Sequence, residues 1–420
     1  MGIVNNLHCP RCAYQAPSKT EFQCPKCRSI LEVDVAIGHL SRDDFLAMRQ
    51  SRDHTIWRWF DFFPLENRSF IVSLGEGCTP LIHAKRLGES IGVGQLYLKN
   101  DTVLPTGSLK DRSNSVGVSK AKELGFTTAT VMSTGNAAAS VAAYAAAAGL
   151  RSVVMVPAGT APAKIIQARA YGALVLVVEG SFDNEVAKLY KAAVQEFGWY
   201  DCLSSNPYRD EGKKSYAYEL ADQLDEQAAD WLIHPTAGGT GLYAARKGFK
   251  ELLSLGWIDR APRLVAAQSA AAAPIVAAFE KGLADVAPVI ARETVAESIQ
   301  VGNPASLGWR ALDAVRASNG TAVALTDCEI IEAQTLLAHL AGVFAEPAAA
   351  TSLAAAKKLV GAGIIRRNEV VVCNLTGHGL KQPSAFSIAP DDLRPIAPTL
   401  SALRERIRAA EGGGPGSLTR

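Results

Sequence analysis

Short, β-rich apolar runs alternate with helical stretches along most of this 420-residue chain, and this alternation limits the possible folds more than any other feature. The predicted strands are residues 96–98, 129–132, 152–156, 174–178, 231–234, 264–268 and 370–375. Strands separated by helices pair in parallel, and their ligands bind at the carboxyl ends. A chain of this length can also bury more than one core. We therefore expect an α/β fold with parallel sheets in two lobes.

The segment Pro105-Thr-Gly-Ser-Leu-Lys-Asp-Arg112 places Lys110 just after a glycine turn. Residues 101–107 are typical of a loop, and residues 113–124 are typical of a helix. The positive end of a helix dipole lowers the pKa of an amine, which leaves more free base to attack an aldehyde. A surface lysine paired with Asp111 is the alternative, and this segment alone does not decide between them.

Three strand-end turns favour the chemical interpretation. Residues 133–137, Ser-Thr-Gly-Asn-Ala, connect a predicted strand to the helix at 137–148 and can bind a carboxylate. Residues 236–241, Thr-Ala-Gly-Gly-Thr-Gly, open the helix at 242–253 and can surround a phosphate, but they lack the features of a nucleotide loop. Thr376 follows the last buried strand. Together with Lys110, these turns indicate a pyridoxal 5'-phosphate site.

Nearly the whole chain resembles threonine synthase and its relatives among the fold-type II pyridoxal phosphate enzymes. The segments that carry the resemblance are residues 73–81, 105–112, 133–136, 206–212, 302–306, 346–348 and 375–380. The resemblance implies a tryptophan synthase β-like fold with two parallel α/β lobes. It also implies a homodimer.

By position, the resemblance makes Lys110 the Schiff-base lysine and the proton carrier. Asn136 would bond the phenolic oxygen of the cofactor, and Thr376 would face the pyridine nitrogen. A hydroxyl at that nitrogen makes the ring a weaker electron sink than an aspartate would, which favours elimination and replacement over transamination. The cofactor phosphate would bind to Ala237, Gly238, Gly239, Thr240 and Gly241.

The activity that the resemblance implies is conversion of O-phosphohomoserine and water to threonine and phosphate. This small, phosphorylated amino acid requires a second anion site, for which the resemblance points to Ser204, Asn206 and Arg209. The substrate α-carboxylate would bind to Ser133 and Thr134. Further charge could come from Lys164 and Lys214. The alternative for Arg209 is an ion pair with its neighbours Asp210 or Glu211.

Two departures from the family pattern keep other reactions open. Leu109 stands where phenylalanine is usual, and the phosphate turn differs from the usual Gly-Asn-x-Gly-Asn type. A related β-replacement enzyme or dehydratase, for example one like cysteate synthase, would act on O-phosphoserine, serine or threonine. An alternative of another class is a zinc-ribbon interaction protein on the same fold. Lys110, Asn136 and Thr376 together argue against it.

Near the amino terminus, Cys9-Pro-Arg-Cys12 and Cys24-Pro-Lys-Cys27 form two C-x-x-C turns. This spacing predicts a zinc ribbon, in which four thiolates hold a structural metal ion. The alternative is that the ribbon binds nucleic acid or a partner. Aromatic residues 57, 59, 60, 62 and 63 are expected to seat this segment against the body or a partner subunit. The other cysteines are expected to be reduced packing residues, namely Cys78, Cys202, Cys328 and Cys373.

The expected division of the chain has four parts. These are a ribbon segment at 1–35, a large cofactor-binding lobe at 36–115 and 207–405, a smaller mobile lobe at 116–206, and a flexible tail at 406–420. The net charge of +2 gives no drive toward nucleic acid or acidic membranes. Without a membrane-spanning run or targeting peptide, a cytoplasmic location is expected.

Overall fold

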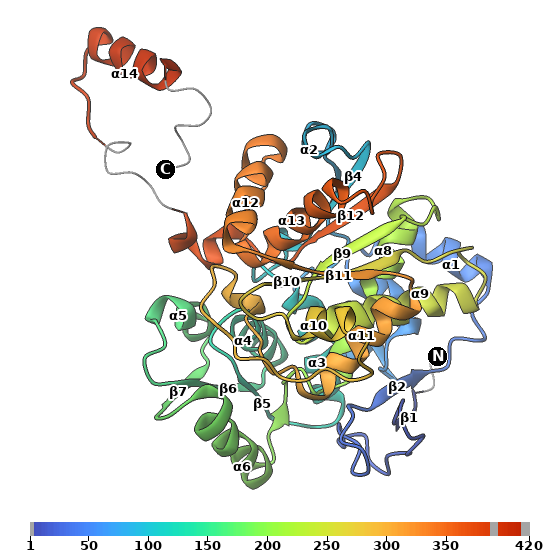
Figure 1. The fold of residues 1–420 in the computed structure, drawn as a ribbon. Coiled ribbons are helices and arrows are strands. Elements are labelled where there is room, and N and C mark those ends of the chain that lie inside the picture. Colours follow the sequence, from blue (N-terminus) through green and yellow to red (C-terminus); the bar gives the residue numbers. More distant parts are fainter. Residues whose placement is uncertain (1–3, 387–393, 413–420) are drawn as a thin grey trace. The chain divides into compact units, whose positions relative to one another are not determined.

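The computed structural model describes residues 4–386 and 394–412, which form two compact units, Met1–Gln382 and Pro383–Arg420 (Figure 1). The second unit contains a short helical turn, Pro383–Ala385, and the helix α14, Leu400–Gly412. The expected flexible tail therefore starts inside α14, and residues 413–420 lie outside the described part. All of the following features belong to the first unit. No helix in the described ranges is both long and apolar enough to cross a membrane.

The larger sheet has six strands in the order β11-β10-β9-β12-β4-β3. Its strands are β3 (Leu81–His83), β4 (Gln95–Asn100), β9 (Trp231–Pro235), β10 (Arg263–Ser269), β11 (Thr321–Leu325) and β12 (Val370–Leu375). All neighbouring pairs are parallel except β3 with β4, which is antiparallel. The edge strands β3 and β11 were not predicted. Each is short or only half-buried, so its apolar pattern is weak.

The smaller sheet has four parallel strands in the order β7-β6-β5-β8. They are β5 (Thr128–Met132), β6 (Arg151–Pro157), β7 (Leu174–Val178) and β8 (Tyr200–Asp201). Each sheet lies within the range expected for one lobe, although the lobe boundaries stay a prediction. The α/β fold with parallel sheets is confirmed.

Helices cover the sheets. They are α1 (Arg42–Arg49), α2 (Lys85–Ile91), α3 (Lys110–Glu123), α4 (Asn136–Ala148), α5 (Pro162–Ala170), α6 (Ala187–Phe197), α7 (Tyr208–Lys213), α8 (Ser215–Gln223), α9 (Thr240–Ser254), α10 (Pro274–Glu280), α11 (Gly308–Ala317), α12 (Asp327–Ala341) and α13 (Pro347–Gly361). Consecutive residues of β9 belong to different clusters of buried hydrophobic residues, because successive side chains of a strand point to opposite faces of the sheet. Leu232 packs with α8 to α11, whereas Trp231 and Ile233 pack with α2, α12 and α13. The larger sheet is thus buried on both faces, which explains its nearly continuous apolar strands.

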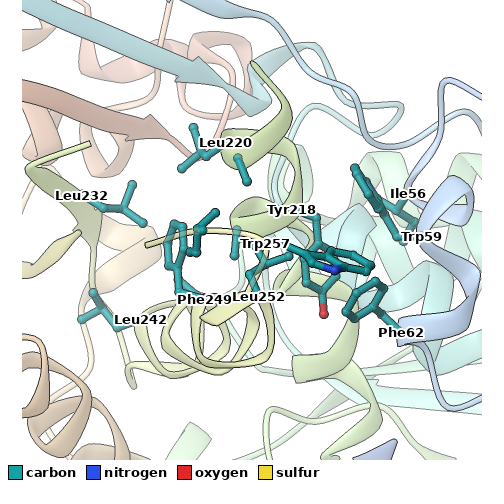
Figure 2. Close-up of a cluster of buried hydrophobic side chains, with 14 of the residues drawn as sticks. Ile56, Trp59, Phe62, Tyr218, Leu220, Leu232, Leu242, Phe249, Leu252 and Trp257 are labelled. Carbon is teal, nitrogen blue, oxygen red and sulfur yellow. The ribbon is translucent and has the colours of Figure 1, made fainter. Parts of the chain in front are cut away.

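The aromatic segment after α1 packs into the core of this larger lobe (Figure 2). The ring of Phe62 lies 4.4 Å from that of Tyr218 on α8 and 5.6 Å from that of Trp257, measured between centroids. Trp59 lies 5.7 Å from Tyr218. The expectation that these aromatic residues seat the ribbon is wrong, because the ribbon packs in a separate cluster that contains Tyr208.

Candidate active site

Lys110 is the first residue of α3, three positions before the predicted start of this helix. The turn that presents it is fixed to the carboxyl end of β12 by two backbone hydrogen bonds. The N–H of Leu109 donates to the carbonyl of Thr376 at 2.9 Å, and the N–H of His378 donates to the carbonyl of Gly107 at 2.9 Å. Lys110 and Thr376, which are far apart in the sequence, are therefore neighbours at one edge of the sheet.

The amine of Lys110 lies in surroundings that favour its free base. Burial lowers its pKa to about 8, helped by the charge of Arg209 and opposed by that of Glu346. The carboxylate of Asp111 instead accepts hydrogen bonds from the hydroxyls of Thr106 and Ser140, at 2.6 and 2.7 Å. Among the ion pairs of the described residues, none joins Lys110 to Asp111. The structure therefore does not support the surface-lysine alternative.

The glycine-rich turn after β9 has the strand–turn–helix geometry that its sequence predicts, and α9 starts at Thr240. Gly239 adopts a φ of +100°, which disfavours any side chain. A β-carbon on Gly238 would lie 3.0 Å from the side chain of Leu307, and one on Gly241 would overlap the ring of His234. Close packing against Leu307 and His234 thus excludes side chains at Gly238 and Gly241, and the backbone N–H groups of such a turn at a helix amino end can bind a phosphate group.

Two more predicted cofactor residues lie near Lys110. Thr376 is buried directly after β12. The side-chain amide of Asn136, the first residue of α4, donates to the carboxylate oxygens of Glu346 at 3.1 and 3.2 Å. Burial raises the pKa of Glu346. Glu346 lies in a segment that carries the resemblance, but the sequence predicts no role for it, because its position opposite Asn136 depends on how the two lobes pack.

Ser133 and Thr134 form the half-buried turn between β5 and α4, as predicted. The N–H of Ser133 donates to the carbonyl of Met155 at 3.2 Å, and its hydroxyl accepts from the N–H of Gly135 at 3.3 Å. These bonds fix the turn beside Asn136. The role of both residues in carboxylate binding stays a prediction.

Arg209 on α7 is buried, yet it pairs with neither of its acidic neighbours. Its Nε donates to the side-chain oxygen of Asn114 at 3.0 Å. Asp210 instead pairs with Arg310 at 2.9 Å, and Glu211 pairs with lysines 214 and 247, each at 2.6 Å. The structure therefore does not support the alternative interpretation of Arg209, an ion pair with Asp210 or Glu211. Within the described part of the chain, no acidic side chain forms an ion pair with Arg209, so its guanidinium can receive an anion.

The remaining substrate candidates lie in different environments. Ser204 is exposed, whereas the buried amide of Asn206 donates to the carbonyl of Asp201 at 2.8 Å and accepts from the N–H of Tyr208 at 3.0 Å. Asn206 thus fixes the start of α7, and its role in binding stays a prediction. Lys164 pairs with Glu297, and Lys214 pairs with both Glu211 and Glu251.

Lys213, which the sequence analysis did not single out, lies at the glycine-rich turn. Its ammonium donates to the hydroxyl of Thr240 at 2.7 Å. Lys213 and Lys214 are adjacent, but successive helical residues point about 100° apart. Only the direction of α7 decides which of the two lysines faces the site, and the sequence pattern contains no signal for that direction.

The four cysteines of the two C-x-x-C turns come together as predicted, and their sulfur atoms all lie within 4.8 Å of one another. Their turns are alike. The N–H of Cys9 donates to the carbonyl of Tyr14 at 2.7 Å, and the N–H of Cys24 donates to that of Ser29 at 2.8 Å. Such a cluster of four thiols beside the antiparallel strands β1 (Val4–His8) and β2 (Glu32–Val35) could hold a metal ion.

Comparisons with known proteins agree with this geometry. Residues 72–377 match the family model "Pyridoxal-phosphate dependent enzyme". The threonine synthase of Methanocaldococcus jannaschii is 42% identical over 86% of this chain and 88% of its own length, and that of Methanosarcina acetivorans is 39% identical over 96% and 98%.

Solved structures of lower identity share the fold. The serine racemase of maize superposes with a TM-score of 0.62 at 19% identity, over 79% of this chain and 93% of that one. The diaminopropionate ammonia lyase of Escherichia coli gives a TM-score of 0.65 at 16% identity, over 84% and 93%. The chain therefore belongs to the family of pyridoxal-phosphate-dependent enzymes and, within it, to the group that contains the threonine synthases.

Proposed function

We propose that this protein is a threonine synthase that converts O-phosphohomoserine and water to threonine and phosphate. The observation that carries the proposal is the buried guanidinium of Arg209, which has no acidic partner among the described residues and lowers the pKa of Lys110 through its charge. A buried charge is costly unless it is compensated. A phosphorylated substrate supplies the missing anion beside the reactive amine.

The residues present fit pyridoxal 5'-phosphate. The bare turn from Ala237 to Gly241 would hold its phosphate, Thr376 would face its ring nitrogen, and Lys110 would bind its aldehyde carbon. When bound, the cofactor acidifies the proton on the α-carbon of the substrate, which carries the amino group, and afterwards those on the β-carbon. Residues of this chain then have to bind the substrate and move its protons.

Lys110 is the proposed proton carrier. With a pKa of about 8, roughly a tenth of its amine is unprotonated at pH 7, far more than for an ordinary lysine, so it can take a proton from the α-carbon and return one later. Arg209 would hold the phosphate ester during these transfers. Its positive charge also stabilises the phosphate as it leaves. Water then supplies the hydroxyl group at the β-carbon of threonine.

Product analysis of the cofactor-loaded protein with O-phosphohomoserine tests this function. Equimolar release of phosphate and threonine is the expected result. Absence of both products from protein that shows the absorbance of bound cofactor would exclude the proposed substrate. The second candidate, β-replacement or dehydration, is favoured by the unusual phosphate turn. It would appear as consumption of O-phosphoserine with an added nucleophile, or as release of a keto acid from serine or threonine.

A matched pair of variants tests the role of Arg209. Replacing Arg209 with methionine should raise KM for O-phosphohomoserine strongly, because the substrate phosphate loses its charged partner. Arg260→Met is the control. Arg260 is an exposed arginine that pairs with Asp230, so its loss should leave KM nearly unchanged. Equal effects of the two substitutions would contradict the assignment of Arg209.

We also propose that the cysteines of the ribbon hold a structural zinc ion. Four protein thiolates fill a tetrahedral shell and leave no position for a reacting water. Sulfur separations of 3.4 Å between Cys9 and Cys27 and 3.5 Å between Cys12 and Cys24 suit ligands of one small ion. One zinc per chain in elemental analysis is the expected result.

A further inference from the structure

The end of α7 brings a second buried cation to the site. The side chain of Lys213 is only 3% exposed, and its ammonium donates to the hydroxyl of Thr240 at 2.7 Å. Thr240 is the first residue of α9 and belongs to the bare glycine-rich turn. A buried lysine on one helix therefore reaches the amino end of another helix, where the partial charge is already positive.

The protein compensates this positive charge only in part. Asp210 is the acidic partner of Lys213, but its nearest oxygen is 3.6 Å from the ammonium, too far for a hydrogen bond. The other oxygen of Asp210 accepts a hydrogen bond from Arg310 at 2.9 Å. One carboxylate is thus shared by two buried cations, and Arg209 and Lys110 add positive charge nearby.

We infer that Lys213 and Thr240 together bind a phosphate monoester at the amino end of α9, and that this group is the phosphate of the cofactor. A lysine supplies three N–H donors and a full charge, whereas a bare turn supplies only backbone donors and a partial charge. A phosphate dianion would compensate the shared cations. It would also restore the affinity of Lys213 for its proton, since burial and the neighbouring cations lower the pKa of this lysine to about 7.

This inference rests on the proposed position of the cofactor and does not depend on the amino-acid substrate. It can therefore be tested without turnover, by comparing the binding of pyridoxal 5'-phosphate with that of pyridoxal, which lacks the phosphate. Absorbance of the lysine-bound cofactor reports both dissociation constants. Failure of the O-phosphohomoserine assay would leave this comparison intact.

Lys213→Met is expected to weaken pyridoxal 5'-phosphate binding about 10-fold or more, the loss that corresponds to one charge-assisted hydrogen bond. Its affinity for pyridoxal should stay unchanged. Lys213→Arg keeps the charge and should recover part of the loss. Lys250→Met, which removes an exposed lysine from α9, is the control and should bind both compounds like the unmodified protein.

The other possible source of the phosphate is the substrate, and calorimetry with inorganic phosphate separates the two sources. If Lys213→Met binds pyridoxal 5'-phosphate normally but the loaded variant binds inorganic phosphate less tightly, Lys213 is a ligand of a second phosphate and the inference is overturned. It is also overturned if neither affinity changes, or if pyridoxal and pyridoxal 5'-phosphate weaken equally. Should Lys213→Met fail to fold, Thr240→Val removes the hydroxyl partner and is judged by the same comparison.

Discussion

Gly212 on α7 allows close contact with α3, so these two helices bring the proposed substrate-binding arginine near the reactive lysine. Alanine at this position should therefore weaken both the fold and the activity. A β-carbon on Gly212 would lie 2.7 Å from the carbonyl carbon of Arg112 on α3 and would overlap the carbonyl oxygen. The carbonyl oxygen would be the closer atom, at 1.8 Å, and non-bonded heavy atoms pack at about 3.5 Å, so α3 and α7 would have to separate by roughly 1–2 Å. This shift would move Arg209 away from Lys110.

Both consequences of the Gly212→Ala substitution have an expected size. Overpacking of this kind lowers the free energy of unfolding by about 1–3 kcal/mol, occasionally more. A displacement of roughly 1 Å in a group that positions the substrate can lower the rate about 100-fold. We therefore expect a lower urea midpoint and a fall in kcat/KM of one to two orders of magnitude, on the basis of these typical values.

Urea unfolding followed by tryptophan fluorescence and steady-state kinetics with O-phosphohomoserine measure the two effects. Gly361→Ala is the matched control, because the last residue of α13 faces open space and a β-carbon there meets no other atom within 4 Å. Alanine at 361 should be neutral or stabilise the fold by up to about 1 kcal/mol. If Gly212→Ala matches the unmodified protein in both assays, α3 and α7 are not packed through this glycine.

Four further predictions concern the site and the ribbon. Lys110→Ala should abolish turnover and the visible absorbance of lysine-bound cofactor; persistence of both would refute the assignment. The rate at which the cofactor-free protein binds the cofactor covalently should rise through about pH 8, as the amine of Lys110 loses its proton. Glu346→Gln should move this rise to lower pH, because the charge of Glu346 raises the pKa of Lys110. Stopped-flow absorbance measures the rate at each pH, and an unchanged midpoint would contradict this prediction. Chelation of the proposed ribbon zinc should raise KM more than it lowers kcat, because Tyr208 of the ribbon cluster precedes Arg209 in the chain; metal content and kinetics measured together would show whether KM follows the loss of metal.

The sequence predicted those parts of the site that depend on local pattern and on parallel topology. Strand-to-helix turns are visible as apolar runs that end in glycine and hydroxyl residues. Parallel strands bring their carboxyl ends to one edge. This is why the turns of Lys110 and Thr376 could be expected to meet, and the bond between Leu109 and Thr376 shows that they do.

Features that depend on the relative orientation of elements were missed or misjudged. The aromatic residues at 57–63 were expected to pack, but their irregular spacing does not indicate their partners, which include Tyr218 on α8 and Trp257 after α9. Likewise, Lys164 and Lys214 were suggested with the resemblance as further charges for the substrate site, but both form ion pairs with glutamates. The lysine that reaches the phosphate turn is the neighbour, Lys213.

The hydrogen-bond partners of two buried arginines distinguish a residue that stabilises the fold from one that we propose binds a ligand. Arg112 is fully buried, and its guanidinium donates to Asp101 at 2.9 Å and to Glu219 at 2.5 and 2.9 Å. Such a compensated network can be stable by itself, whereas removing one member would leave an unpaired buried charge. Arg209 is equally buried but has a neutral amide as its hydrogen-bond partner. Both arginines are buried, and only Arg112 has a carboxylate as hydrogen-bond partner within the described part of the protein, which is why we propose that Arg209 binds an anionic group of the substrate.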